Sequence, residues 1–314
     1  MNNSVLLIGN GLNRCYYHEL AWGGLLSDIA HVHKLSMNGN NSFPMEFECI
    51  VYQILKGMNH PSDRIYTEIK KEIVKRIQNI KKTENPLMES FMEIPVSEII
   101  TTNYDYLLER AYKGEPCIDE CRDKIEKGSG ETKYSLYRYT TINGRRFYHI
   151  HGELLVPDSL CLGSEHYAGY LSKIQSSFKR GKEIDSDHIM MIIQSSAGRR
   201  DTWVDSFFNK DIHVVGLGLD QCEIDLWWIV TYRAFLFFTD LYGARKFLQN
   251  RIVYYDIVKD NEKPYEKAKR ELLRHNLTLQ HVEYYPVDIS KDNYISGYEK
   301  VIEIIRNRVY DRAL

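Results

Sequence analysis

The residue types best suited to chemistry in this sequence follow two apolar runs that predict β-strands. Asn103 and Asp105 come directly after the first run, and His151 comes directly after the second and precedes Gly152. A side-chain amide can orient a water or a hydroxyl group, and an imidazole can transfer protons near neutral pH. Because ligands bind at the carboxyl ends of strands in open α/β sheets, these residues predict an acid–base site at that edge.

Each of these residues also has a purely structural interpretation. Asn103 or Asp105 can accept a backbone N–H and cap the helix that the sequence predicts up to about Tyr112. His151 can be a buried histidine whose ring nitrogens are satisfied by its neighbours. In a strand His149 and His151 would share a face, which suggests a metal, but no third ligand stands nearby. The six cysteines are scattered, and a structural zinc site needs four ligands, so we expect no metal.

Two strand-to-glycine turns strengthen the functional interpretation. The run at 5–8 leads into Gly9-Asn10-Gly11-Leu12-Asn13-Arg14, and the run at 213–215 leads into Gly216-Leu217-Gly218. Glycine lets the backbone approach a phosphate closely, and a helix N-terminus beyond it attracts anions. Either turn alone is also typical of an ordinary loop, because the third glycine of the dinucleotide fingerprint is missing. Two such units in one chain fit the two halves of a doubly wound nucleotide-binding fold.

The elements that position these residues alternate between strands and helices. Strands are predicted at 5–8, 96–101, 134–139, 146–150, 213–215, 251–258 and 282–287, and helices over much of 16–93 and at 103–112, 201–208, 224–238, 264–274 and 298–309. Ser62 and Ser164 are predicted N-caps, and the spacing of Asp220 and Glu223 predicts a capping box. The economical fold is one α/β domain over residues 1–314, Rossmann-like and doubly wound, with a mostly parallel sheet. It carries a helical insertion at about 30–93, either a lid or an oligomer surface, and an exposed excursion at about 113–133.

The overall composition excludes several classes of protein. Hydrophobic residues make up 43% and charged residues 27%, which is ordinary for a globular protein. A net charge of -2 gives no basic excess, so we expect no direct nucleic-acid binding. The longest apolar stretch, 224–238, contains Asp225 and Arg233 and is too short to span a bilayer, so we expect no membrane association. We expect a cytoplasmic protein with reduced thiols.

In these motifs the sequence resembles the SIR2-like family. The resemblance rests on the order and spacing of four motifs, which are Gly9-Asn10-Gly11-Leu12-Asn13-Arg14, Thr102-Asn103-Tyr104-Asp105, His151-Gly152 and Gly216-Leu217-Gly218. It covers about residues 4–230. More narrowly, the sequence is similar to the bacterial SIR2-like domains of anti-phage defence systems.

The resemblance implies a Rossmann-like NAD-binding fold and assigns roles to individual residues. Asn103 and His151 are the implied catalytic pair, and Asp105 is implied to shape the nicotinamide or ribose pocket. The implied contacts with NAD are Gly9, Asn10, Gly11, Asn13, Arg14, Thr102, Gly152, Gly216 and Gly218. Arg14 has an alternative in which it lies in solvent.

Three departures from the sirtuin deacylases argue against protein-lysine deacylation. The first turn is Gly-Asn-Gly rather than Gly-Ala-Gly with its following serine, no pair of Cys-x-x-Cys zinc ligands is present, and Glu153 follows His151-Gly152 in place of a small residue. Domains of the defence branch hydrolyse NAD. We therefore expect cleavage of the nicotinamide–ribose bond to ADP-ribose and nicotinamide, with NAD as substrate and no cofactor required.

Two alternatives and a mode of control accompany this expectation. The chain can instead be an NAD-dependent deacylase or ADP-ribosyltransferase, or a non-catalytic sensor of NAD or ADP-ribose, and NADP stays open as the substrate. A suicidal NAD hydrolase must be restrained in the resting cell. We expect that control to come from homo-oligomerisation, a small nucleotide signal or a separate partner such as an ATPase.

Overall fold

Four consecutive apolar side chains place strand β1 (Ser4–Ile8) in the middle of the fold. Val5 and Leu7 face one apolar core, and Leu6 and Ile8 face another on the opposite side. This alternation follows from strand geometry, in which successive side chains point to opposite faces. A continuous apolar run is what a strand needs when helices cover both faces of its sheet.

The computed structural model describes residues 3–37, 39, 41–80, 84–113, 125–126, 133–180, 183–184, 186–194, 202–290 and 293–311. The strands of the main sheet are β1, β2 (Glu98–Thr101), β3 (Ile125–Glu126), β4 (Tyr139–Ile142), β5 (Arg145–His149), β8 (Asp211–Val215), β9 (Ile252–Lys259) and β10 (Glu283–Ile289). Two short strands, β6 (Lys179–Arg180) and β7 (Glu183–Ile184), form a separate hairpin.

The main sheet has eight strands in the order β10-β9-β8-β1-β2-β5-β4-β3. Every pairing from β10 to β5 is parallel, and the pairings β5·β4 and β4·β3 are antiparallel. The chain leads from β1 outward to β2 and β5 and then returns to β8 on the other side of β1. This reversal is the switch point of a doubly wound fold, so the predicted Rossmann-like α/β class is confirmed.

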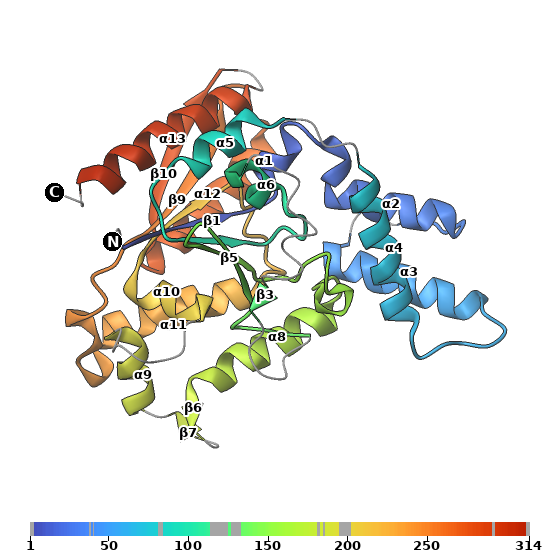
Figure 1. The fold of residues 1–314 in the computed structure, drawn as a ribbon, viewed down its shortest axis with the longest axis horizontal. Coiled ribbons are helices and arrows are strands. Elements are labelled where there is room, and N and C mark those ends of the chain that lie inside the picture. The colour runs from blue at the N-terminus through green and yellow to red at the C-terminus, as the bar shows by residue number, and fades with distance from the viewer. Residues whose placement is uncertain are drawn as a thin grey trace.

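The helices cover both faces of the sheet (Figure 1). They are α1 (Gly11–Arg14), α2 (Trp22–Val32), α3 (Phe43–Gly57), α4 (Ile65–Asn79), α5 (Pro86–Met92), α6 (Leu107–Lys113), α8 (Ser164–Ser177), α9 (Ser186–Ile193), α10 (Trp203–Asn209), α11 (Ile224–Thr239), α12 (Pro264–Leu279) and α13 (Tyr294–Asp311), with short 3₁₀ helices η1 (His18–Leu20), η2 (Pro157–Ser159) and η3 (Leu241–Lys246). The core shared with α5, α6 and α13 contains Leu6 and Ile8. The core shared with α8, α10, α11 and α12 contains Val5 and Leu7.

The helical insertion predicted at about 30–93 contains α3, α4 and α5, and of these α3 and α4 lie together with the preceding α2 on one side of the sheet (Figure 1). The insertion contacts the loop that follows β5. Lys70 of α4 is 2% exposed and donates from Nζ to the carbonyl of Asp158 at 3.0 Å, and Thr67 donates to the Asp158 carboxylate at 2.9 Å. Burial lowers the pKa of Lys70 to about 8. The predicted excursion at 113–133 lies outside the described residues apart from its first and last residues and β3.

The strand predicted at 134–139 is wrong. The hydroxyl of Ser135 accepts the N–H groups of Tyr137 and Arg138 at 3.2 and 2.9 Å, which turns the chain there. The strand β4 instead begins at Tyr139 and joins β5 through Asn143 and Gly144, both with positive φ. An Asn-Gly pair of this kind is the preferred two-residue hairpin turn.

Both predicted serine N-caps are wrong. Ser62 precedes α4 by three residues, and its hydroxyl accepts the N–H of Arg64. Ser164 lies inside α8, one residue after Gly163, which is the cap. The imidazole Nδ1 of His166 accepts the N–H of Gly163 at 2.9 Å, so the orphan donor at this helix start is satisfied by a ring nitrogen.

Candidate active site

The two glycine turns interlock at the switch point. The N–H of Gly11 donates to the carbonyl of Gly216 at 2.8 Å, and the N–H of Gly9 donates to Val215 at 2.9 Å. A Cβ on Gly9 would lie 2.5 Å from the Gly216 oxygen, and a Cβ on Gly11 would lie 2.7 Å from the Gly216 Cα. Gly216 also has a φ of +63°. These three glycines are therefore required by the close approach of the turns themselves.

The other residues of the glycine turns lie in different surroundings. A Cβ on Gly218 would meet only the Asp220 carboxylate at 3.8 Å, so this glycine borders open space. Asn10 donates to the carbonyl of Leu20 at 2.8 Å. Arg14 is exposed, as in the solvent alternative.

Asn103 lies just beyond the carboxyl end of β2, beside the first glycine turn. The Thr101 hydroxyl donates to the Ile8 carbonyl and accepts the N–H of Asn103, which ties the residue to β1. Thr102 donates its N–H to the same Ile8 carbonyl at 3.4 Å. The Asn103 amide nitrogen lies 3.5 Å from the carbonyl of Gly9, and Oδ1 is buried without a hydrogen-bonding partner among the described residues. This oxygen is free to accept a hydrogen bond from a ligand.

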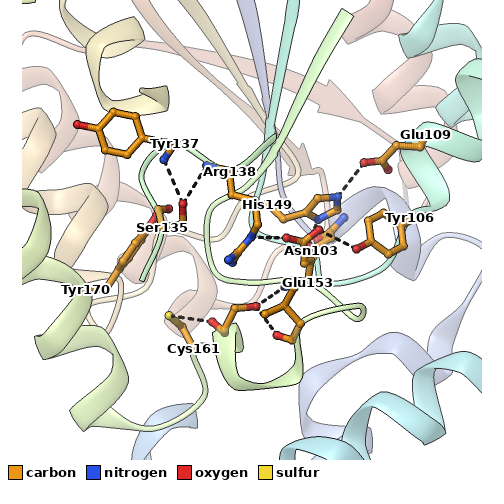
Figure 2. Close-up of polar contacts among 12 residues, drawn as sticks. Asn103, Tyr106, Glu109, Ser135, Tyr137, Arg138, His149, Glu153, Cys161 and Tyr170 are labelled. Atoms are coloured by element: carbon orange, nitrogen blue, oxygen red, sulfur yellow. Dashed lines mark hydrogen bonds and ion pairs between the residues drawn. The ribbon is translucent and has the colours of Figure 1, made fainter. Parts of the chain in front are cut away.

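A buried imidazole supports the backbone of Asn103 (Figure 2). The Nδ1 of His149 lies 2.7 Å from the Asn103 carbonyl, and Nε2 lies 2.8 Å from the carboxylate of Glu109. Both acceptors require a ring N–H, so the imidazole is charged. Burial by itself lowers the pKa of His149, but the charge and hydrogen bond of Glu109 outweigh it and raise the pKa to about 9.

Asp105 adopts the capping alternative. Its Oδ1 accepts the N–H of Leu107, the first residue of α6, at 3.0 Å, and its Oδ2 accepts from the Asn13 amide at 2.9 Å. The side chain is 4% exposed. Asp105 therefore joins α6 to α1, while the Oδ1 of Asn13 is buried without a partner in the described part of the chain.

His151 lies in the turn after β5 and has a different hydrogen-bonding partner from those of His149. The strand ends at His149, so the predicted shared face does not form. The Nε2 of His151 lies 2.9 Å from Oδ2 of Asp225 in the first turn of α11, and both side chains are at most 3% exposed. No described residue hydrogen-bonds Nδ1, and the ring meets Tyr167 edge-on at 5.2 Å. Burial lowers the pKa of His151, but Asp225 outweighs it and the net shift is upward.

The turn that carries His151 is held by a second buried network (Figure 2). Gly152 has a φ of +101°, and a Cβ there would lie 2.4 Å from the carbonyl of Ser159. Glu153 forms an ion pair with Arg138 and accepts the hydroxyl of Tyr106 at 2.7 Å. Gly152 is therefore needed for the backbone of the turn, and Glu153 anchors it.

Sequence reasoning missed Asp225 and Glu223 as site residues. The signal for Asp225 was a carboxylate inside an otherwise apolar helix, where burial without a partner is costly. The predicted capping box is wrong, because Glu223 is the residue before α11 and caps no N–H with its side chain. Its Oε2 is buried without a partner among the described residues, and burial raises its pKa to about 7. Asp220 instead pairs with Lys269 at 2.6 Å.

An open pocket of about 770 Å³ lies at the carboxyl ends of β8 and β9. It is lined by the turn 218–222, by Trp227, by the end of β9 including Asp256, and by one side of α12. Residues 41–43, which lead into α3, also line it. The ring of Phe43 contacts Trp22 at 5.2 Å, and Trp22 contacts Tyr104 at 4.5 Å, so aromatic side chains connect this pocket with the residue next to Asn103.

Neither a metal-binding cluster nor a membrane-spanning helix is found among the described residues. None of their histidine, cysteine, aspartate and glutamate side chains come together in groups of three or more that could hold a metal ion. None of the helices among them is long and apolar enough to cross a membrane.

Comparison with known proteins matches one segment of the chain to a family. The family model of the SIR2-like domain matches residues 97–205, which include Asn103, Asp105 and His151. No curated protein matches the chain. The matched segment runs from β2 to α10, through the two strand ends described above. Over this segment the predicted resemblance to the SIR2-like family is confirmed.

Proposed function

We propose that this protein is an NAD⁺ hydrolase that cleaves the nicotinamide–ribose bond to ADP-ribose and nicotinamide. The observation that carries the proposal is that two buried polar side chains with free polar atoms follow the carboxyl ends of the neighbouring parallel strands β2 and β5. Asn103 has a buried, unpartnered Oδ1, and His151 has one ring nitrogen without a hydrogen bond to any described residue. In a SIR2-like fold these are an orienting amide and a proton acceptor.

Unpartnered buried polar atoms near the two strand ends support the binding of a polar ligand there. Four side chains each have one buried oxygen without a hydrogen-bonding partner in the described chain, namely Asn13, Asn103, Glu223 and Asp225. Leaving such atoms unpaired in the interior costs about 1–3 kcal/mol each, so native structures rarely do so without a reason. Ribose hydroxyls and water can donate to all of these oxygens, because each oxygen is an acceptor.

The reaction follows from the chemistry of the groups. Departure of neutral nicotinamide with the electrons of the glycosidic bond leaves an oxocarbenium-like ribose, and water adds at the same carbon. Asn103 orients the water or the ribose hydroxyls, and Nδ1 of His151 takes the proton that the water loses. Each such contribution is worth about 10²–10⁴-fold. The carboxylate of Glu223 stabilises the positive charge on the ribose.

The remaining predicted contacts fit a ligand that extends from the strand ends at Asn103 and His151. Gly218 borders the pocket beyond β8, and we assign the adenosine end of NAD to that pocket. Asp105 shapes the nicotinamide end indirectly, because it holds Asn13 by a hydrogen bond of 2.9 Å. Gly9, Gly11 and Gly216 let the two turns approach each other under the phosphates. No metal or cofactor takes part in this scheme, and NAD is the substrate.

We further propose that the enzyme is a cytoplasmic, regulated effector of anti-phage defence by abortive infection. The support is the resemblance of its motifs to the defence branch of the SIR2-like family. Such an enzyme must be inactive until needed, so homo-oligomerisation or a separate partner such as an ATPase would control it. Activity that rises steeply with protein concentration would favour control by self-association.

Chromatography of NAD incubated with the purified protein tests the proposal. Wild type is expected to give ADP-ribose and nicotinamide, and Asn103→Ala and His151→Gln are expected to lose about 10²–10⁴-fold of that rate. His213→Gln is the matched control, because His213 is also buried and its Nδ1 lies 3.0 Å from the hydroxyl of Tyr255. Activity that survives both site substitutions would refute the site. Tight NAD binding without turnover at any protein concentration would refute the hydrolase.

A further inference from the structure

We propose that Asp225 is a positioning residue, which holds His151 in the tautomer that carries its proton on Nε2 and so makes Nδ1 the atom that accepts the proton from water or ribose. The role of Nδ1 in the reaction rests on the proposed function. The position of the proton on the His151 ring does not depend on it.

The hydrogen-bond geometry defines the tautomer. A carboxylate can only accept, so a distance of 2.9 Å between Nε2 of His151 and Oδ2 of Asp225 requires the hydrogen on Nε2. In the neutral imidazole the lone pair is then on Nδ1. No described residue hydrogen-bonds Nδ1, so the second nitrogen is left for a ligand.

The position of Asp225 is held by a rigid element. Asp225 is the second residue of α11, and its neighbour Leu226 and the next-turn residue Ile229 are buried in the core shared with β8. A negatively charged side chain in the first turn of a helix is favoured by the helix dipole. A residue on a packed helix places its partner more accurately than one on a loop.

Stability alone does not explain this pair. Removing a carboxylate and an imidazole from water costs free energy that their attraction recovers only when the remaining polar atoms are also satisfied. Here Oδ1 of Asp225 is buried without a partner in the described chain. The titratable side chains that face His151 are Asp225 on α11, Glu223 before it, and Tyr167 and Tyr170 on α8, while Cys161 donates its N–H to the His151 carbonyl at 2.8 Å. Asp225 and Glu223 are the two carboxyl groups of this set.

Asp225→Asn tests the positioning role. The amide can donate as well as accept, so the ring is no longer held in one tautomer. We expect a kcat loss of about 10²–10⁴-fold, the range of one acid–base contribution, with KM changed by less than about 3-fold. Loss of the carboxylate also lowers the pKa of His151, so the acid limb of the kcat/KM profile moves to lower pH. Asp240→Asn, at the other end of the same helix, is the matched control, because Asn tolerates the positive φ of 52° there.

Nitrogen NMR of wild-type protein labelled at histidine gives an independent readout. The His151 signals are assigned by their loss in His151→Gln. Above the pKa of the ring, the wild type is expected to show a protonated Nε2 and an unprotonated Nδ1, and Asp225→Asn is expected to show a mixture. A protonated Nδ1 in the wild type would overturn the inference, and so would Asp225→Asn with full kcat and an unshifted pH profile.

The two readouts separate the inference from the proposed function. If the wild type does not turn NAD over but the spectrum shows the proton on Nε2, the hydrolase fails and the positioning of His151 by Asp225 stands. If NAD is hydrolysed but the proton lies on Nδ1, the hydrolase stands and the inference fails. The wild-type spectrum does not depend on whether Asp225→Asn folds.

Discussion

His149 donates a hydrogen bond of 2.7 Å to the main-chain carbonyl of Asn103, and the two residues come from the ends of neighbouring parallel strands. The same imidazole donates to the buried carboxylate of Glu109 at 2.8 Å. The ion pair with Glu109 fixes the position of the His149 ring. The fixed ring then fixes the main chain of Asn103, from which the Asn103 side chain extends. The side-chain amide of Asn103, which we assign to catalysis, is therefore positioned by the charged imidazole of His149.

The His149–Glu109 pair predicts that stability falls as the pH rises. The pKa of His149 is about 9 in the folded protein and 6.5 in the unfolded chain, so the folded state holds this proton more tightly. The stabilisation is complete below about pH 6.5 and is lost as the pH passes through about 9. Urea unfolding across this range is expected to show a loss on the order of 3 kcal/mol in wild type.

His149→Gln removes the titrating group, so its stability is expected to be lower and much less dependent on pH over this range. His275→Gln, at an exposed position on α12, is the matched control and should keep the slope of wild type. Equal slopes in wild type and His149→Gln would contradict the assignment of the charge to His149.

Gly11→Ala is expected to destabilise the protein strongly. The added Cβ would lie 2.3 Å from the Tyr298 hydroxyl and 2.7 Å from the Gly216 Cα, and backbone cannot move aside as a flexible side chain can. Overpacking of this kind costs about 1–3 kcal/mol or more. Thermal unfolding is the measurement. Gly23→Ala, on a helix with no atom within 4 Å of the new Cβ, is the control and should raise the stability by about 0.5–1 kcal/mol. A Gly11→Ala protein as stable as wild type would mean that the turns are not in contact.

Arg145→Lys is expected to cost about 2–4 kcal/mol in stability while leaving the turnover of the folded fraction unchanged. The guanidinium donates to the carbonyls of Met92, Ile94 and Val96 at 2.7–3.0 Å, and lies 4.1 Å from the centre of the Tyr112 ring. An ammonium cannot reach three carbonyls in this arrangement. Arg274→Lys, in an exposed pair, is the control and should change stability by less than about 0.5 kcal/mol in the same urea titration.

The order of strands and helices was predictable from the sequence because it depends on local patterns. The run Val5–Ile8 is apolar on both faces of its strand, so a buried parallel strand is its only satisfactory environment. The strand at 134–139 was mispredicted because the Ser135 hydroxyl binds two backbone N–H groups and turns the chain. Such a competing side-chain hydrogen bond leaves no trace in hydrophobic periodicity.

The site was predictable only in part, for a different physical reason. Asn103 and His151 follow strand ends, and strand ends can be located from local sequence. Asp225 reaches His151 across 74 positions of the chain. That contact depends on how α11 packs beside the strand end, and no local spacing encodes it. The same holds for Asn13 and Asp105, which are 92 positions apart.

Glu223 predicts a second ionisation in the pH profile of NAD hydrolysis. Burial raises its pKa to about 7, and the charge of His151 opposes this rise, so the two groups are within electrostatic reach. In our scheme the ionised carboxylate stabilises the ribose cation, and His151 must be neutral to accept a proton. Both groups must therefore lose a proton before the enzyme is active, and log kcat/KM is expected to rise with a slope of two below both apparent pKa values.

Glu223→Gln keeps the shape of the side chain and removes its charge, so the acid limb is expected to fall to a slope of one. The rate at the plateau is also expected to fall, because a neutral amide does not stabilise a cation as a carboxylate does. Glu89→Gln, at an exposed position on α5, is the control and should keep the wild-type slope. A slope of two that persists in Glu223→Gln would mean that the second proton leaves another group, and Asp225 would be the next carboxyl to test, since it is the other acidic side chain that faces His151.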